Sequence, residues 1–309
     1  MSKKTIIVVQ GGISKEREIS LETAKSCIKA IKKIGYKVIK FDPKFSSIWD
    51  IKKIKSDIIF NALHGKDGED GKIQCMFEYF QKAYTHSGVV ASMVAMNKHL
   101  SKQIFIKNKI KTPKYIYVNE KSGAKINFLN EIKKNKINFP IVIKPNDEGS
   151  SIGVKICKNK NSFKKELKIL EKKYKNLIIE NYIPGQEIQV ALMGGKAIGA
   201  IELRPKRKFY DYKAKYLKSS KTEHIMPAEI PYRKYKEVLK LSEKANKVLG
   251  CKGITRCDFR FYKGNFFLLE LNTQPGMTDL SLVPEIAKFV KIPFTKLVKW
   301  MINDASRNR

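Results

Sequence analysis

Residues 254–272 read ITRCDFRFYKGNFFLLELN and carry the strongest indication of fold and chemistry in this chain of 309 residues. Two apolar runs, Ile254–Tyr262 and Phe266–Leu271, flank the short polar segment Lys263-Gly264-Asn265. Runs rich in β-branched and aromatic residues on either side of a glycine-containing turn predict a β-hairpin. We therefore expect an antiparallel strand pair in the last third of the chain.

Three oxygen-bearing side chains lie close together on this hairpin. Glu270 and Asn272 share one face because alternate residues of a strand point the same way, and Asp258 can oppose them from the other strand. Such donors suit Mg²⁺, which binds carboxylates together with substrate phosphates. The alternative is a solvated hairpin with unrelated acids, although acids in such apolar strands need a counter-charge. Position alone leaves both interpretations open.

The N-terminal third alternates strands and helices. Strands are expected at Thr5–Val9, Tyr36–Phe41 and Asp57–Ala62. A helix with apolar residues at helical spacing ends at Gly35, and another begins after Gly71. This order predicts a parallel α/β unit.

A second candidate site lies in the middle third. The expected strand Phe139–Pro145 carries Lys144 and is followed by the loop Glu148-Gly149-Ser150-Ser151-Ile152-Gly153. Glycines and small hydroxyl residues let backbone N–H groups approach phosphate oxygens, although a plain tight turn has the same composition. Further along, Arg204–Pro227 is long and polar and has no period, which predicts a mobile loop.

Composition narrows the class of protein. The formal net charge is +34, which would suit nucleic-acid binding. The lysines are spread along the chain, however, and compositional drift explains them better, so we expect no nucleic-acid partner. No apolar run is long enough for a signal peptide or a membrane span, which predicts a soluble, cytoplasmic protein without a membrane partner. The five cysteines are scattered without a CxxC pair and are expected mostly in the core.

Six segments resemble, in order and in spacing, the motifs of the D-alanine–D-alanine ligase family of the ATP-grasp superfamily. Each segment alone could be chance, but together they run nearly from end to end of the chain. They are Gly11–Ser20, His64–Gly71, Lys144–Gly153, Phe209–Tyr216, Arg256–Asp258 and Leu269–Thr278.

The resemblance implies an α/β fold in three parts. It implies an N-terminal parallel α/β (Rossmann-like) substrate-binding domain at residues 1–97. A two-lobed α+β ATP-grasp module would follow, with a central lobe at 98–185 and a C-terminal lobe at 186–309 that carries a mobile lid loop at 204–227. It also implies ATP as co-substrate, two Mg²⁺ ions that Mn²⁺ can replace, D-alanine as the amino-acid substrate, and a homodimer.

The resemblance further implies roles for individual residues. The implied metal ligands are Asp258, Glu270 and Asn272. The implied ATP contacts are Lys98, Lys144, Ser150, Ser151 and Lys215 at the phosphates, and Glu180 and Glu187 at the adenine and ribose. The implied residues at the amino acids are Glu16 at the first ammonium, Ser281 and Leu282 at the second substrate, and His64 beside them. Arg256 and the Gly276 N–H would stabilise a tetrahedral oxyanion, and Glu16, Ser150 and Tyr216 would form a hydrogen-bonded bridge.

Structural roles remain as alternatives for some of these residues. His64 can be a supporting or core histidine, and Arg256 can form a structural ion pair with Asp258 or Glu270. The chain also departs from the family pattern at Asn97, where the family usually has aspartate, and at Leu280, where it often has histidine. A ligase of D-alanine and D-lactate, or another ATP-grasp carboxylate–amine ligase, is the nearest alternative function.

Overall fold

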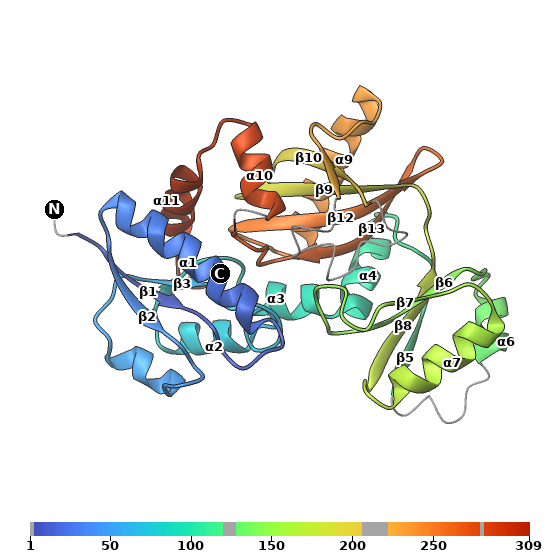
Figure 1. The fold of residues 1–309 in the computed structure, drawn as a ribbon, viewed down its shortest axis with the longest axis horizontal. Helices are drawn as coiled ribbons and strands as arrows, with labels where there is room; N and C mark the ends of the chain where they lie inside the picture. Colours follow the sequence, from blue (N-terminus) through green and yellow to red (C-terminus); the bar gives the residue numbers. More distant parts are fainter. Residues whose placement is uncertain (1–2, 120–127, 206–221, 279–280) are drawn as a thin grey trace.

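The computed structural model describes residues 3–119, 128–205, 222–278 and 281–309. Within these residues the strands form three sheets, one of five strands and two of four (Figure 1). Each sheet is built from one continuous stretch of the chain, in the order N-terminal, middle and C-terminal. The architecture is therefore mixed α/β, with one parallel sheet and two antiparallel sheets.

The N-terminal sheet is parallel, as the alternation of strands and helices predicts. Its strand order is β2-β1-β3-β4. Helix α1 ends at Gly35, which has a left-handed φ of 94° and donates its N–H to the carbonyl of Lys32. The elements are β1 (Thr5–Val9), α1 (Arg17–Ile34), β2 (Lys37–Phe41), the 3₁₀ helix η1 (Ile48–Lys53), β3 (Ile58–Asn61), α2 (Lys72–Tyr79), β4 (Ala83–Tyr84) and α3 (Val89–Met96).

The middle sheet is antiparallel, with the strand order β5-β8-β6-β7. Helices α6 and α7 share one apolar core with it. Helix α4 precedes the sheet, and a separate helix, α3, ends two residues before α4 begins. The elements are α4 (Lys98–Lys107), β5 (Tyr115–Asn119), α6 (Phe128–Lys134), β6 (Ile141–Pro145), β7 (Lys155–Cys157), α7 (Lys160–Glu171) and β8 (Asn176–Asn181).

The C-terminal sheet is antiparallel, in the order β11-β10-β9-β12-β13. Its last two strands form the expected hairpin, in which Asp258 pairs with Glu270 and Arg256 pairs with Asn272. Helix α9 packs on the face that carries Val190, and α10 packs on the face that carries Ala191. The elements are β9 (Gln186–Met193), β10 (Lys196–Arg204), β11 (Glu223–Ile225), α9 (Tyr232–Val248), β12 (Ile254–Tyr262), β13 (Asn265–Asn272), α10 (Leu282–Phe289) and α11 (Phe294–Asp304).

The last helices tie the C-terminal sheet to the N-terminal one. Helix α11 packs beside α1 (Figure 1), and residues of α10, α11, α1 and β1 belong to one apolar core. Four of the five cysteines are buried, as expected for core residues. In the part of the chain that the structure describes, no helix combines the length and the apolar character needed to cross a membrane.

Residues 204–205 and 222–227 of the segment expected as a mobile loop are described, and both parts contain strand residues. Arg204 ends strand β10, and β11 pairs with that strand in antiparallel register. Strand structure therefore reaches into both ends of the expected loop, and β11 was not predicted because a three-residue strand carries no readable period. Lys215 and Tyr216 lie outside the described residues.

Candidate active site

Two adjoining hollows lie where the three sheets meet. The first is lined by residues from all three parts of the chain, and the second by the middle and C-terminal parts. Their empty volumes, which include space open to solvent, are about 910 and 810 Å³. Lys98, Glu148 and Glu270 line both hollows. A ligand in one hollow would therefore share a wall with a ligand in the other.

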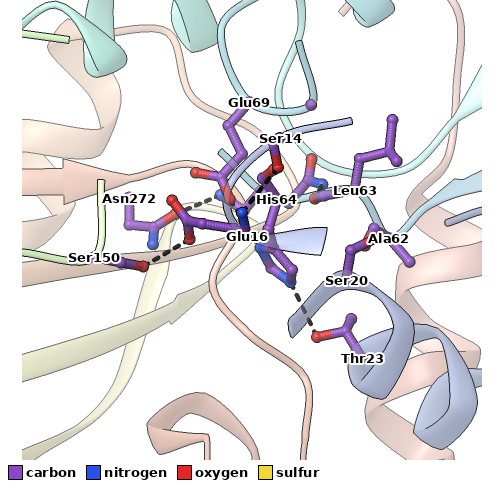
Figure 2. Close-up of polar contacts among 12 residues, drawn as sticks. Ser14, Glu16, Ser20, Thr23, Ala62, Leu63, His64, Glu69, Ser150 and Asn272 are labelled. Atoms are coloured by element: carbon purple, nitrogen blue, oxygen red, sulfur yellow. Dashed lines mark hydrogen bonds and ion pairs between the residues drawn. The ribbon is translucent and has the colours of Figure 1, made fainter. Parts of the chain in front are cut away.

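Glu16 presents a buried carboxylate to the first hollow. It immediately precedes α1, and its side chain is packed so closely that a Cβ on Gly65 would lie 2.9 Å from its Oε1. The Ser150 hydroxyl donates a hydrogen bond of 2.6 Å to Glu16 Oε2, as Figure 2 shows. This contact brings together two members of the expected bridge, and it joins the N-terminal part to the loop of the middle lobe.

His64 also lines the first hollow, but both of its ring nitrogens have protein partners. Nδ1 lies 2.8 Å from Glu69 Oε1, and Nε2 lies 3.0 Å from the hydroxyl of Thr23 (Figure 2). The backbone oxygen of His64 accepts a hydrogen bond from Ser14, two residues before Glu16. These contacts favour the supporting role: His64 fixes the loop beside Glu16.

Ser281 and Leu282 close the first hollow from the C-terminal side. Ser281 precedes α10, and its hydroxyl is hydrogen-bonded to both the N–H and the hydroxyl of Thr278. Gly276 faces it so closely that a Cβ there would lie 2.9 Å from Ser281 Oγ. All three expected residues, Gly276, Ser281 and Leu282, line the hollow that contains Glu16.

Arg256 contributes a cation to the same hollow and is anchored by Asp258. Its Nε and its terminal Nη2 donate to the two carboxylate oxygens of Asp258 over 2.7 and 2.9 Å. The two residues are two positions apart on β12, so both point to one face. The ion pair that the sequence left as an alternative is therefore present, and it coexists with a position at the wall of the hollow.

The expected metal ligands converge at the end of the hairpin. Asp258 and Glu270 are direct cross-strand partners, and Glu270 and Asn272 both line the first hollow. No group of three His, Cys, Asp or Glu side chains in the described ranges is placed to hold a metal, and Asn272 adds an amide side chain beside the two carboxylates. Two carboxylates and one amide are oxygen donors of the kind that Mg²⁺ prefers.

Two lysines and four glutamates line the second hollow, and Glu148 and Glu270 among them belong to both hollows. Lys98 begins α4, donates to the backbone oxygen of Glu148 over 2.6 Å, and lies 3.5 Å from Glu270 Oε2. Lys144 pairs with Glu180 over 2.6 Å. Glu187 lies 3.7 Å from an Arg260 nitrogen across the β9–β12 pair. The two lysines, Glu180 and Glu187 were all expected to contact ATP, and the structure gathers them in one hollow with the Glu180 carboxylate facing lysines.

The loop after Lys144 has an unusual backbone. Ser150 and Ser151 have φ angles of 49° and 60°, and Gly153 has one of 73°. Non-glycine residues in this left-handed region cost on the order of 1 kcal/mol or more each, and they concentrate at functional sites. Ser150 contributes to the first hollow and Ser151 to the second. The loop therefore forms part of the boundary between the two hollows.

Several residues of the site had escaped the sequence reasoning. Lys15 forms a 2.9 Å ion pair with Glu148, beside the Glu16–Ser150 contact. Lys102 is fully buried and pairs with Glu180 over 2.8 Å. Its position four residues after Lys98 on α4 was the available signal, because it places both lysines on one helix face.

The departure at Asn97 has a visible consequence. Its side-chain oxygen accepts a hydrogen bond from the N–H of Leu100 and caps the N-terminus of α4. An aspartate would cap in the same way, so the amide retains this local role. Leu280, Lys215 and Tyr216 lie outside the described residues.

Comparison with known proteins identifies the family of this chain. Residues 104–303 match the family model "D-ala D-ala ligase C-terminus". The chain is 53% identical to the D-alanine–D-alanine ligase of Pelagibacter ubique over 309 residues, which is 100% of both chains. It is 46% identical to that of Wolbachia pipientis, over 99% of this chain and 95% of the relative.

The fold of the chain also matches that of a solved D-alanine–D-alanine ligase structure. The crystal structure of D-alanine–D-alanine ligase from Bacillus anthracis complexed with ATP superimposes with a TM-score of 0.86 at 32% identity. The match covers 98% of this chain and 97% of that one. The resemblance carried by the six sequence motifs is thus confirmed, and this chain belongs to the D-alanine–D-alanine ligase family.

Proposed function

We propose that the chain joins two D-alanine molecules at the expense of ATP, with the amino acids in the first hollow and the nucleotide in the second. The observation that carries this proposal is the wall that both hollows share. Lys98, Glu148 and Glu270 line both of them. The phosphate end of a nucleotide would therefore meet the carboxyl group of an amino acid beside two acidic residues and one lysine.

The reaction that suits this arrangement proceeds in two steps. A carboxylate oxygen of the first D-alanine attacks the γ-phosphorus of ATP, and ADP leaves. The amine of the second D-alanine then attacks the acyl carbon, loses a proton, and displaces phosphate from a tetrahedral intermediate. Negative charge develops on the acyl oxygen in the second step, so the site must supply a cation or N–H donors there.

The residues of the first hollow fit these needs. The buried Glu16 carboxylate would bind the ammonium of the first D-alanine, with Ser150 holding the carboxylate in place. Ser281, with Leu282 beside it, would receive the carboxyl group of the second. Arg256 and the N–H of Gly276 would stabilise the oxyanion, because a planar guanidinium can follow charge as it develops on oxygen.

The second hollow would hold the nucleotide. Lys98, Lys144 and the backbone of Ser150 and Ser151 would contact phosphates, and Glu187 would contact the ribose. We propose a supporting role at the base of the hollow for the Glu180 carboxylate, because two lysines already hold it. The roles of Lys215 at the γ-phosphate and of Tyr216 in the bridge remain predictions from the family pattern.

Asp258, Glu270 and Asn272 would hold two Mg²⁺ ions, which Mn²⁺ can replace. The donor set fits, since it consists of oxygens at one end of the hairpin with Glu270 in the wall between the hollows. Magnesium bound there would neutralise charge on the transferred phosphoryl group. Arg256 and Lys98 contact two of these carboxylates, so each acid already has a cation nearby.

A product assay tests the proposed function. The protein is incubated with ATP, Mg²⁺ and D-alanine, and ADP, phosphate and dipeptide are quantified in parallel. The three products should appear in equal amounts, and L-alanine should give none. A preference for D-lactate over a second D-alanine would favour the depsipeptide alternative, and ADP release without any ligated product would contradict the proposal.

The cellular setting is proposed on the same basis. The product would serve peptidoglycan precursor synthesis in the cytoplasm, and the active form would be a homodimer. Sedimentation or light scattering of the purified protein measures its mass directly. A species of 35.5 kDa, the mass of one chain, would contradict the homodimer.

A further inference from the structure

Behind the second hollow lies a buried group of three charges. Glu180, in the middle of strand β8, forms ion pairs with Lys102 through Oε2 over 2.8 Å and with Lys144 through Oε1 over 2.6 Å. Lys102 also donates a 2.6 Å hydrogen bond to the hydroxyl of Thr112. One carboxylate is thus held between two ammonium groups, one on helix α4 and one on strand β6.

The two lysines are not equivalent. Lys144 and Glu180 line the hollow, whereas Lys102 has no exposed surface and is not among its lining residues. A nucleotide phosphate could therefore reach Lys144 but not Lys102. The phosphate would compete with Glu180 for Lys144. If Lys144 moved to the phosphate and no other cation remained, Glu180 would be a buried carboxylate without a counter-charge, which is strongly unfavourable.

We propose that Lys102 is a positioning residue for nucleotide binding. It neutralises the Glu180 carboxylate, so that the Lys144 ammonium can leave Glu180 and bind a nucleotide phosphate. The proposal rests on the assignment of the second hollow to ATP. Without Lys102, binding would leave Glu180 as a buried charge with no cation, so Lys144 would stay with Glu180. With Lys102, the group keeps one positive charge in excess and offers it to the nucleotide.

The test measures ADP affinity in the presence of Mg²⁺ by titration calorimetry, so it does not depend on turnover. Lys102→Met should weaken ADP binding by about tenfold or more, because a buried carboxylate then competes for Lys144. The KM for D-alanine should change far less than the KM for ATP. Lys107→Met removes an exposed lysine from the same helix and serves as the matched control, with wild-type affinity expected.

A double variant separates this mechanism from general damage. If Lys102 acts by neutralising Glu180, then Lys102→Met combined with Glu180→Gln should recover most of the lost ADP affinity. Equal losses in the single and double variants would show that Lys102 acts independently of Glu180, and would overturn the proposal. Wild-type affinity in a folded Lys102→Met variant would overturn it as well.

The wild-type chain provides an independent measurement if Lys102→Met does not fold. Burial lowers the pKa of Lys102 to about 8. The charged or titratable groups that face it are Glu180, Lys144 and Lys98, together with the ring of Tyr115, whose pKa burial raises. The ADP dissociation constant should therefore rise as the pH rises through about 8, and a flat profile from pH 7 to 9 would overturn the proposal.

One further variant distinguishes this inference from the proposed function itself. Lys144→Met should abolish most ADP binding if the second hollow is the nucleotide site. Normal ADP binding in Lys144→Met would contradict the site assignment. Loss of binding in Lys144→Met together with normal binding in Lys102→Met would contradict only the role of Lys102.

Discussion

Replacing Arg256 by alanine should separate a structural from a chemical role of this residue. Its guanidinium makes two hydrogen bonds to Asp258, of 2.7 and 2.9 Å, and their side chains are only 13% and 7% exposed. Asp258 also faces Glu270 directly across the hairpin. Loss of the arginine therefore leaves a buried carboxylate next to a second one, with no guanidinium to neutralise either.

The two roles predict losses of known size in different measurements. Removing one partner of a buried ion pair costs about 3–5 kcal/mol, so Arg256→Ala should lower the free energy of unfolding by about 3 kcal/mol without Mg²⁺. Removing one donor to a developing oxyanion costs about 3–4 kcal/mol in the barrier, roughly a hundred- to a thousandfold in rate. Mg²⁺ with ADP should restore stability by neutralising Asp258 and Glu270, but it should not restore turnover.

Urea denaturation with and without Mg²⁺–ADP measures the first quantity, and phosphate release from ATP and D-alanine measures the second. Arg256→Lys keeps the charge but not the forked geometry, so it should regain most of the stability and only part of the rate. If Mg²⁺–ADP restored turnover as well as stability in Arg256→Ala, the role of Arg256 would be only to neutralise the charge of Asp258. Stability that never falls would show that the ion pair with Asp258 has little energetic weight.

Three further predictions each concern a single residue. Ser150→Ala removes the 2.6 Å hydrogen bond to Glu16, worth about 1.5–3 kcal/mol for a charged acceptor, so the KM for the first D-alanine should rise at least about tenfold; an unchanged KM would refute the bridge. Glu270→Gln should raise the Mg²⁺ concentration needed for half-maximal turnover about tenfold, and an unaltered Mg²⁺ titration would remove Glu270 from the metal site. Burial lowers the pKa of His86 to about 3, so unfolding takes up a proton below pH 6.5; stability should fall by about 2 kcal/mol from pH 7 to pH 5 through this group. Urea denaturation at the two pH values checks this, and His86→Phe should show a loss smaller by that amount.

Much of the fold could be predicted because its signals are local. Strands such as Thr5–Val9 and the hairpin after Ile254 are continuous apolar runs bounded by turn residues, and the helix that ends at Gly35 shows a clear period. Helix α3 (Val89–Met96) was not predicted, because its residues are apolar on almost every side and show no helical period. Strand β4 has two residues, too few for any alternation.

In the candidate site, too, contacts between residues close in sequence could be predicted, and contacts between distant residues could not. Residues two apart on one strand, such as Arg256 and Asp258, must share a face, so their ion pair could be foreseen as an alternative. The contacts between Lys102 and Glu180, or between Lys15 and Glu148, join residues more than 70 positions apart. No periodicity relates them, because they follow from how the sheets pack. Family resemblance supplied the named residues, but it did not indicate which cations hold which carboxylates.

Three carboxylates of the site share one electrostatic feature, because each of them is paired with at least one cationic side chain. Asp258 forms an ion pair with Arg256, and Glu270 forms one with Lys98. Glu180 forms ion pairs with both Lys102 and Lys144. A nucleotide brings phosphates that attract the lysines, and magnesium brings charge that attracts the carboxylates, so each partnership can be exchanged for one with a substrate. Exchange of partners costs less than exposure of bare buried charge. A carboxylate whose cation is drawn away therefore needs a second cation, and in this arrangement Lys102 is that cation for Glu180.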